Sequence, residues 1–121
     1  MAARKSANRR KARPPRAALV LSAYPSAAAA SRAARALVTA RVMACATVAP
    51  GARATFRWEG HLRRERSAIL WGKTTAAKAA AAVRAIRASH PDRVPEILVI
   101  PVVGGHAPYF AWLAAETGGK R

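Results

Sequence analysis

The sequence predicts an α+β domain whose elements follow the order strand, helix, strand, strand, helix, strand, with a short helix at the end. The first observation behind this prediction is a set of apolar runs of strand length. The second is a helical apolar periodicity in two segments between those runs. The third is the placement of Pro and Gly residues at the expected boundaries. The predicted strands cover residues 17–23, 43–58, 67–74 and 95–103.

The first half of the chain predicts a strand followed by an amphipathic helix. Residues 17–23, AALVLSA, are a continuous apolar run of strand length. Ser26 follows a proline and is a good N-cap for a helix of about 15 residues. The arginines of this segment fall largely off its apolar face. That face is predicted to contain Ala30, Ala34, Leu37 and Val38.

The middle of the chain predicts two long strands joined by a polar hairpin. Phe56 and Trp58 alternate with Arg57, as residues of a strand with one buried face do. Pro50 and Gly51 should interrupt or bulge the first of these strands. Residues 59–66 are predicted to form the hairpin, and residues 67–74 the returning strand.

A second helix, a buried strand and a short helix complete the prediction. Thr74 or Thr75 is the expected cap of the second helix, which should stop before Pro91. The run 95–103 reads as a buried strand, and Pro108 suits the first turn of the last helix. Gly118 should end that helix. The predicted inner faces contain Ala79, Val83 and Ile86 in the second helix and Tyr109, Trp112 and Leu113 in the last.

This order of elements is the split βαβ, or ferredoxin-like, pattern. In that topology the sheet order is 4-1-3-2, so the second and fourth strands are edges. Pro50 and Pro101 lie in those two strands, and proline within a sheet is largely confined to edges and bulges. Two long edge strands favour pairing with other chains, so we expect a homo-oligomer.

Composition predicts one strongly basic domain between two tails. The chain has 121 residues and a net charge of +17, which favours contact with nucleic acid or another acidic surface. Residues 1–16 contain seven basic residues and no acid, so we expect a disordered tail. The domain should cover residues 17–116, and residues 117–121 should be a flexible C-terminus.

We also expect a cytoplasmic protein without a membrane partner. The N-terminal stretch imitates a secretory signal, but Tyr24-Pro25-Ser26 breaks its apolar run. No run of about 20 apolar residues is present. The single cysteine, Cys45, excludes an internal disulfide framework.

No catalytic motif is visible, so we expect a protein that is not an enzyme. Cys45 lies in an apolar run, where a free cysteine is usually an inert small hydrophobe. His61 and His106 lie in predicted loops. His90 ends a helix, where an imidazolium would meet the negative end of the helix dipole, and it is also a candidate metal ligand. The three tryptophans should fill the core or an oligomer interface.

Three separated blocks carry a resemblance to a known family. They are ACATVAPGARATFRWEGHL, then KTT, then HPDRVPEILVIPVVGGHAPYFAWL. Together they resemble the CutA divalent-cation tolerance family over about residues 17–115. The resemblance implies a ferredoxin-like homotrimer with a role in the response to divalent metal ions and copper binding. It also implies a central hairpin that reaches into neighbouring subunits, and an architecture similar to the PII signalling proteins.

The resemblance further implies a copper site made of a cysteine and two adjacent histidines. Here those positions hold Ser22, Ser89 and His90, so only His90 retains its ligand type. A hydroxyl is a much poorer ligand for copper than a thiolate or an imidazole. Asp92 and Glu96 are the nearby candidates for oxygen ligands of Cu(II) or another divalent cation.

Two other functions stay open at this stage. The first is a PII-like module that binds a small anion in a cleft between subunits, with Lys73 and Arg93 as candidate residues. The second is non-specific nucleic-acid binding through residues 1–16 and the arginine-rich faces. Divalent-cation tolerance is the leading prediction.

Overall fold

The chain alternates strands and helices in the predicted order in the computed structural model, which describes residues 16–118. The predicted disordered N-terminal tail and flexible C-terminus lie largely outside these residues. Within the described range, Arg16 already accepts a backbone hydrogen bond from Ala76, and Thr117 is buried inside the last helix. The elements are β1 (Ala17–Tyr24), α2 (Ala27–Thr39), β2 (Cys45–Trp58), β3 (His61–Thr75), a 3₁₀ turn η1 (Ala76–Lys78), α3 (Ala79–Ser89), β4 (Ile97–Val102) and α4 (Ala107–Thr117).

The four strands form one antiparallel sheet in the order β2-β3-β1-β4. This is the predicted order, and Pro50 and Pro101 do lie in the two edge strands. The pairing of β2 with β3 shifts between Ala49 and Ala52, which places the predicted bulge at Pro50-Gly51. Gly51 has a φ of 80°, a conformation that glycine adopts without strain.

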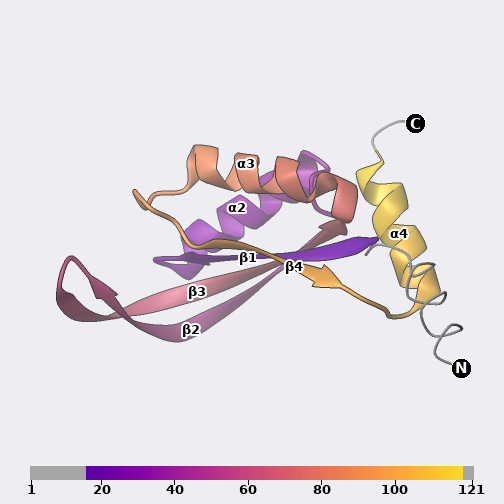
Figure 1. Ribbon diagram of the computed structural model, residues 1–121. Helices are drawn as coiled ribbons and strands as arrows, with labels where there is room; N and C mark the ends of the chain where they lie inside the picture. Colours follow the sequence, from indigo (N-terminus) through magenta and orange to yellow (C-terminus); the bar gives the residue numbers. More distant parts are fainter. Residues whose placement is uncertain (1–15, 119–121) are drawn as a thin grey trace, which may run out of the picture.

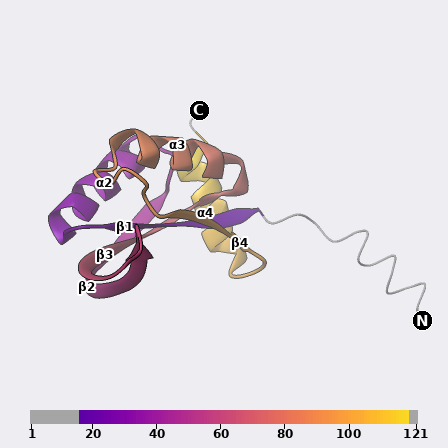
Figure 2. The ribbon, with the colours of Figure 1, turned by 60° about the vertical axis from the view of Figure 1, so that its left-hand side comes forward.

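Helices α2 and α3 cover one face of the sheet, and Figures 1 and 2 both show them on the same side. Ser26 caps α2, since its side chain accepts a hydrogen bond from the Ala29 N–H at 3.1 Å. The apolar stripes of the two helices pack on alternate residues of β1 and β3. The core between them includes Val20, Leu37, Met43, Leu70 and Ile86, which are almost fully buried.

The opposite face of the sheet is apolar and is not covered by α2 or α3. Side chains alternate along a strand, so residues next to the core positions point to this second face. The register pairs Leu21 with Leu98 and with Trp71, and Leu19 with Ile100, so these side chains share that face. Trp71 is 37% exposed and Leu98 is 51% exposed. We call this surface the open sheet face; it consists of Leu19, Leu21, Ile69, Trp71, Leu98 and Ile100.

The central hairpin differs from the prediction. The returning strand starts at His61 and not at residue 67, because the turn needs only Glu59 and Gly60. Both residues have positive φ values, 49° and 82°, which match the two-residue turns that suit the twist of a hairpin. The paired strands therefore extend beyond the helices, at the left of Figure 1.

Several predicted buried faces are exposed. The strand predicted over 95–103 as buried is the shorter edge strand β4, and Val38 of α2 is 38% exposed. Phe56 is also exposed, as are Tyr109 and Trp112, so only Leu113 of the three residues predicted for the inner face of α4 is buried. The buried face of α4 also contains Thr117 and the partly buried Phe110. For β4 the reason is that α2 and α3 cover only one face of the sheet (Figure 1).

The start of α3 also differs from the prediction. Thr74 is buried in β3, and Thr75 makes no side-chain capping bond, so neither threonine caps the helix. Gly118 does follow the end of α4, as predicted. None of the helices within residues 16–118 combines the length and the apolarity that crossing a bilayer requires.

Candidate functional site

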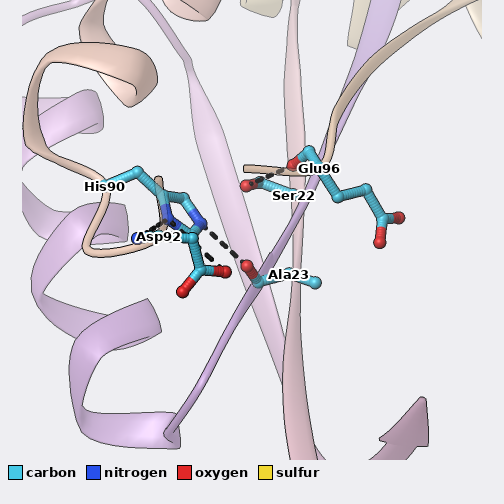
Figure 3. Close-up of polar contacts among 5 residues, drawn as sticks. All are labelled: Ser22, Ala23, His90, Asp92 and Glu96. Carbon is cyan, nitrogen blue, oxygen red and sulfur yellow. Dashed lines mark hydrogen bonds and ion pairs between the residues drawn. The ribbon is translucent and has the colours of Figure 1, made fainter. Parts of the chain in front are cut away.

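His90 lies at the C-terminal end of α3, with its side chain fully buried. Its Nε2 lies 2.8 Å from the carbonyl oxygen of Ala23, so this nitrogen donates. The backbone N–H of Asp92 donates to Nδ1 at 3.0 Å, so this nitrogen accepts. Figure 3 shows the two contacts on opposite sides of the ring. The backbone thus selects the neutral tautomer with its proton on Nε2 and occupies both ring nitrogens.

The ring of His90 also stacks on Tyr24 of β1. The two ring centroids lie 4.3 Å apart, and the ring planes differ by 24°. Burial raises the pKa of the Tyr24 phenol above its ordinary value, and the Ser22 side chain opposes this shift. His90 therefore joins the end of α3 to the end of β1 by a stack and a hydrogen bond, which is a structural role that the helix-end position alone does not reveal.

The two serines at the other implied copper positions also have partners in the backbone. Ser22 is fully buried in β1, and its hydroxyl donates to the Glu96 carbonyl oxygen at 2.8 Å. The hydroxyl of Ser89 lies 3.4 Å from the Ala85 carbonyl oxygen, on the exposed side of α3. Two hydroxyls and an imidazole without a free lone pair do not fit a copper site. The three positions therefore hold the fold together in this arrangement.

The two candidate oxygen donors differ in how they lie relative to His90. The carboxylate of Asp92 is half-exposed, with Oδ2 at 4.0 Å from Nδ1 of His90. Glu96 approaches Ser22 through its backbone only, and its side chain points away from His90 in Figure 3. Across residues 16–118, no three His, Cys, Asp or Glu side chains gather as a metal site requires. The structure thus brings His90 and Asp92 together and leaves Glu96 apart.

A cleft of about 350 Å³ opens beside this cluster, between the hairpin and the segment that follows α3. It is lined by aromatic side chains from β1 and β2 and by carboxylates from β3 and the loop before β4. The sequence did not reveal this cleft, because residues 54–67 and 92–96 are distant along the chain and meet only in the fold. Its lining includes Tyr24, Phe56, Trp58, Glu65, Asp92 and Glu96.

The side chain of Arg93, a candidate for anion binding, contacts two residues of the central hairpin. Its guanidinium carbon lies 5.7 Å from the ring centroid of Trp58, which is a cation–π arrangement. Its Nη2 lies 3.4 Å from a carboxylate oxygen of Glu59 in the turn. Both partners are in the central hairpin, so Arg93 fixes the loop before β4 to the hairpin.

Lys73, the other candidate, lies toward the opposite end of β3. Its ammonium group donates to Thr47 Oγ1 at 2.5 Å and lies 3.8 Å from Cys45 Sγ. Cys45 is half-buried beside a cation, an electropositive setting that its apolar sequence context did not indicate. A single chain therefore does not bring Lys73 and Arg93 into one site.

A second cleft, of about 250 Å³, lies beside Lys73 at the start of α4. Gly104, Gly105 and His106 form one wall, and Tyr109 forms part of another. Burial, and then the proximity of Cys45, raise the pKa of the Tyr109 phenol. In the first turn of α4, the N–H groups of Tyr109 and Phe110 donate to the His106 carbonyl oxygen, and Pro108 has no N–H, so the helix start offers this cleft little beyond the Ala107 N–H.

Comparisons with known proteins agree with one another. The family model described as "CutA1 divalent ion tolerance protein" matches residues 18–116. A protein of Citrobacter koseri named "Divalent-cation tolerance protein CutA" is 37% identical over 102 residues, which cover 84% of this chain and 89% of that protein. The crystal structure of CutA from Xylella fastidiosa is similar with a TM-score of 0.81 and 35% identity, over 84% of this chain and 97% of that one. The divalent cation tolerance protein from Thermus thermophilus is similar with a TM-score of 0.81 and 34% identity, over 84% and 99%.

Proposed function

Because the chain belongs to the CutA1 divalent ion tolerance family, we propose that it acts in divalent-cation tolerance as a cytoplasmic homotrimer without enzymatic activity. The observation that carries this proposal is the family match, which spans the whole folded domain from residue 18 to residue 116. We further propose that the response involves copper or another divalent cation.

The open sheet face supports the homotrimer. Neither α2 nor α3 covers the six apolar side chains of this face, and α4 reaches only the end of the face at Leu19. The face extends to the sheet edge at β4. An exposed apolar patch rimmed by polar residues is typical of a protein interface. Tyr109 and Trp112 of α4 are also 40% and 42% exposed, which extends the apolar surface at one end of the sheet.

Size-exclusion chromatography with light scattering, which measures the mass of the assembly, tests the homotrimer. The parent should elute with a mass three times the chain mass of 12.8 kDa. Ile100→Lys, on the open sheet face, should shift the mass toward that of one chain, because burying an unpaired charge in an interface is costly. Val38→Lys is the matched control, since Val38 is 38% exposed and Ile100 39%, but Val38 lies on the helix layer. A monomeric parent, or equal effects of the two substitutions, would contradict the proposal.

The proposed contact with the ion is Nδ1 of His90 together with the Asp92 carboxylate. This ring nitrogen faces the half-exposed Asp92, and it becomes a ligand only where the Asp92 N–H gives up its hydrogen bond. One imidazole and one carboxylate are fewer donors than a preformed site provides. We therefore expect weak binding of Cu(II), well below the affinity of a site with a thiolate and two imidazoles.

Isothermal titration with Cu(II) tests this contact. Asp92→Asn removes the carboxylate from an exposed position and should weaken binding without unfolding the chain. His90→Ala should abolish the same binding, while His61→Ala, in the exposed hairpin, should leave it unchanged. If His90→Ala and Asp92→Asn both bind Cu(II) as the parent does, the assignment to His90 is wrong.

A PII-like module for a small anion is the second candidate, and the cleft beside Lys73 favours it. Lys73 lines this cleft and supplies positive charge to it, and His106 lines it too. Thermal stability measured with inorganic phosphate and with nucleotides at low salt tests this candidate. Stabilisation that Lys73→Gln removes would support it. If no anion stabilises the parent, this candidate function is excluded.

A further inference from the structure

The outer face of the helix layer carries positive charge and no negative charge. Helices α2 and α3 contain no acidic residue, and each presents two exposed arginines three residues apart. This spacing places both arginines of a helix on one face. In α2 that face is opposite Ala30 and Leu37, which are buried against the sheet. We call this surface the helix-layer face; its arginines are Arg32, Arg35, Arg84 and Arg87.

The four guanidinium groups of the helix-layer face have no partner among residues 16–118. The arginine ion pairs in that part of the chain involve Arg41, Arg63 and Arg93, which lie elsewhere. An arginine without a carboxylate partner keeps its five N–H donors available for an external acceptor. Its planar fork matches the oxygens of a phosphate group. The face is therefore a set of four unused phosphate-binding groups on two rigid helices.

The side chains between these arginines are small, and this narrows the choice of partner. They are Ala, Ser and Thr, and Val38 near the end of α2 is the one larger apolar side chain exposed there. A surface that binds membranes needs several large apolar side chains that enter the lipid, and this face lacks them. A surface that binds single-stranded nucleic acid needs aromatic side chains on which bases stack. The aromatic residues of the described chain lie in β1, β2, β3 and α4, and none lies in α2 or α3.

We infer that the helix-layer face binds the phosphate backbone of double-stranded nucleic acid without reading its sequence. The affinity comes from counterion release as each guanidinium neutralises a phosphate. The absence of acidic residues removes the repulsion that such a surface would otherwise face. The helix layer lies on the opposite side of the sheet from the open sheet face (Figure 1), so the inference does not depend on the proposed metal-ion role or on the assembly.

Fluorescence anisotropy with a labelled 20-base-pair duplex tests the inference on the full chain. The seven basic residues of segment 1–16 stay in place in every variant. The first variant changes the four arginines of the helix-layer face to Gln. The control variant removes the same charge from the central hairpin, where the arginines are also exposed. The control substitutions are Arg53→Gln, Arg57→Gln, Arg64→Gln and Arg66→Gln.

The salt dependence of binding is the readout that separates the two variants. Each lost phosphate contact lowers the slope of log affinity against log salt by about 0.9, so the helix-layer variant should lose about 3 to 4 in slope. The hairpin control should lose less than about 1 in slope. Circular dichroism should show that both variants keep the parental fold.

Four outcomes would overturn the inference. The first is a parent that does not bind the duplex at low salt. The second is an equal loss in the two variants, which would mean that net charge alone drives binding. The third is a preference for single-stranded DNA of equal charge. The fourth is binding to vesicles with anionic lipid that needs the four arginines, when the duplex is not bound.

Discussion

Replacement of His90 by Ala should destabilise the chain even when no metal ion is present. The substitution removes the hydrogen bond from Nε2 to the Ala23 carbonyl and the acceptor for the Asp92 N–H. It also removes the aromatic stack on Tyr24. The bond to Ala23 and the stack on Tyr24 join the end of α3 to β1, and the bond from Asp92 fixes the turn that follows the helix. A residue that served only as a metal ligand would give no such effect.

The expected loss follows from the three contacts. Each hydrogen bond contributes about 1 kcal/mol, and the stack on Tyr24 about 1 kcal/mol. The expected decrease in the free energy of unfolding is therefore about 3 kcal/mol. His90→Asn should lose less, because an amide oxygen close to the backbone still accepts from the Asp92 N–H.

Urea denaturation in EDTA, at one fixed protein concentration, measures this loss. Fixed concentration matters because the stability of an oligomer depends on the amount of protein. His106→Ala is the matched control, since His106 is exposed at the start of α4 and makes no side-chain capping bond. It should change stability by less than about 0.5 kcal/mol. If His90→Ala in EDTA is as stable as the parent, the structural role of this ring is wrong.

Three further predictions concern other parts of the fold. Gly72→Ala should cost about 1 to 3 kcal/mol in urea denaturation, because the new methyl group would overlap the buried end of Met43, and the same substitution should cost less in a Met43→Ala background. Glu59→Asn should raise the melting temperature by a few degrees, because Asn before Gly60 suits the left-handed turn and Glu does not; an unchanged value would contradict this. The phenol of Tyr24 has a raised pKa in the folded state, so its contribution to stability is present below pH 10.0 and is lost as the pH rises further. Tyr24→Phe should therefore lose less stability than the parent between pH 8 and pH 11 in urea titrations; an equal loss would refute the prediction.

The sequence predicted the order of elements and the strand order because these depend on local signals. Ser26 caps its helix as expected, and Pro50 and Pro101 mark the two edges. The prediction of a hairpin over residues 59–66 was wrong, since residues 61–66 are polar apart from Leu62 and show no alternation of apolar and polar residues. A strand that extends beyond the core needs no buried face, and only the turn geometry at Glu59 and Gly60 fixes its register.

The candidate site was harder to predict, because its properties depend on contacts between distant segments. The sequence identified His90, but not that its ring would be buried against β1 with both nitrogens occupied. Ser22 reaches Glu96, 74 positions away, through its hydroxyl. The Ser22 bond follows from the pairing of β1 with β4, and the bond of His90 to Ala23 from the packing of the end of α3 on β1, so no local pattern around His90 indicates them.

The exposure of residues that were predicted to be buried supports the proposed assembly. Apolar periodicity measures which residues avoid water, whether a helix of the same chain or another subunit covers them. Leu98 and Ile100 of β4 follow the pattern of buried residues but remain exposed in one chain. Trp71, in the central strand β3, is likewise apolar and exposed in one chain. The arginines of α2 and α3 lie on the helix-layer face, on the other side of the sheet from the open sheet face. A trimer built on the open sheet face would therefore bury the apolar surface and present the helix-layer face three times, which would raise the avidity for a long polyanion without any new contact.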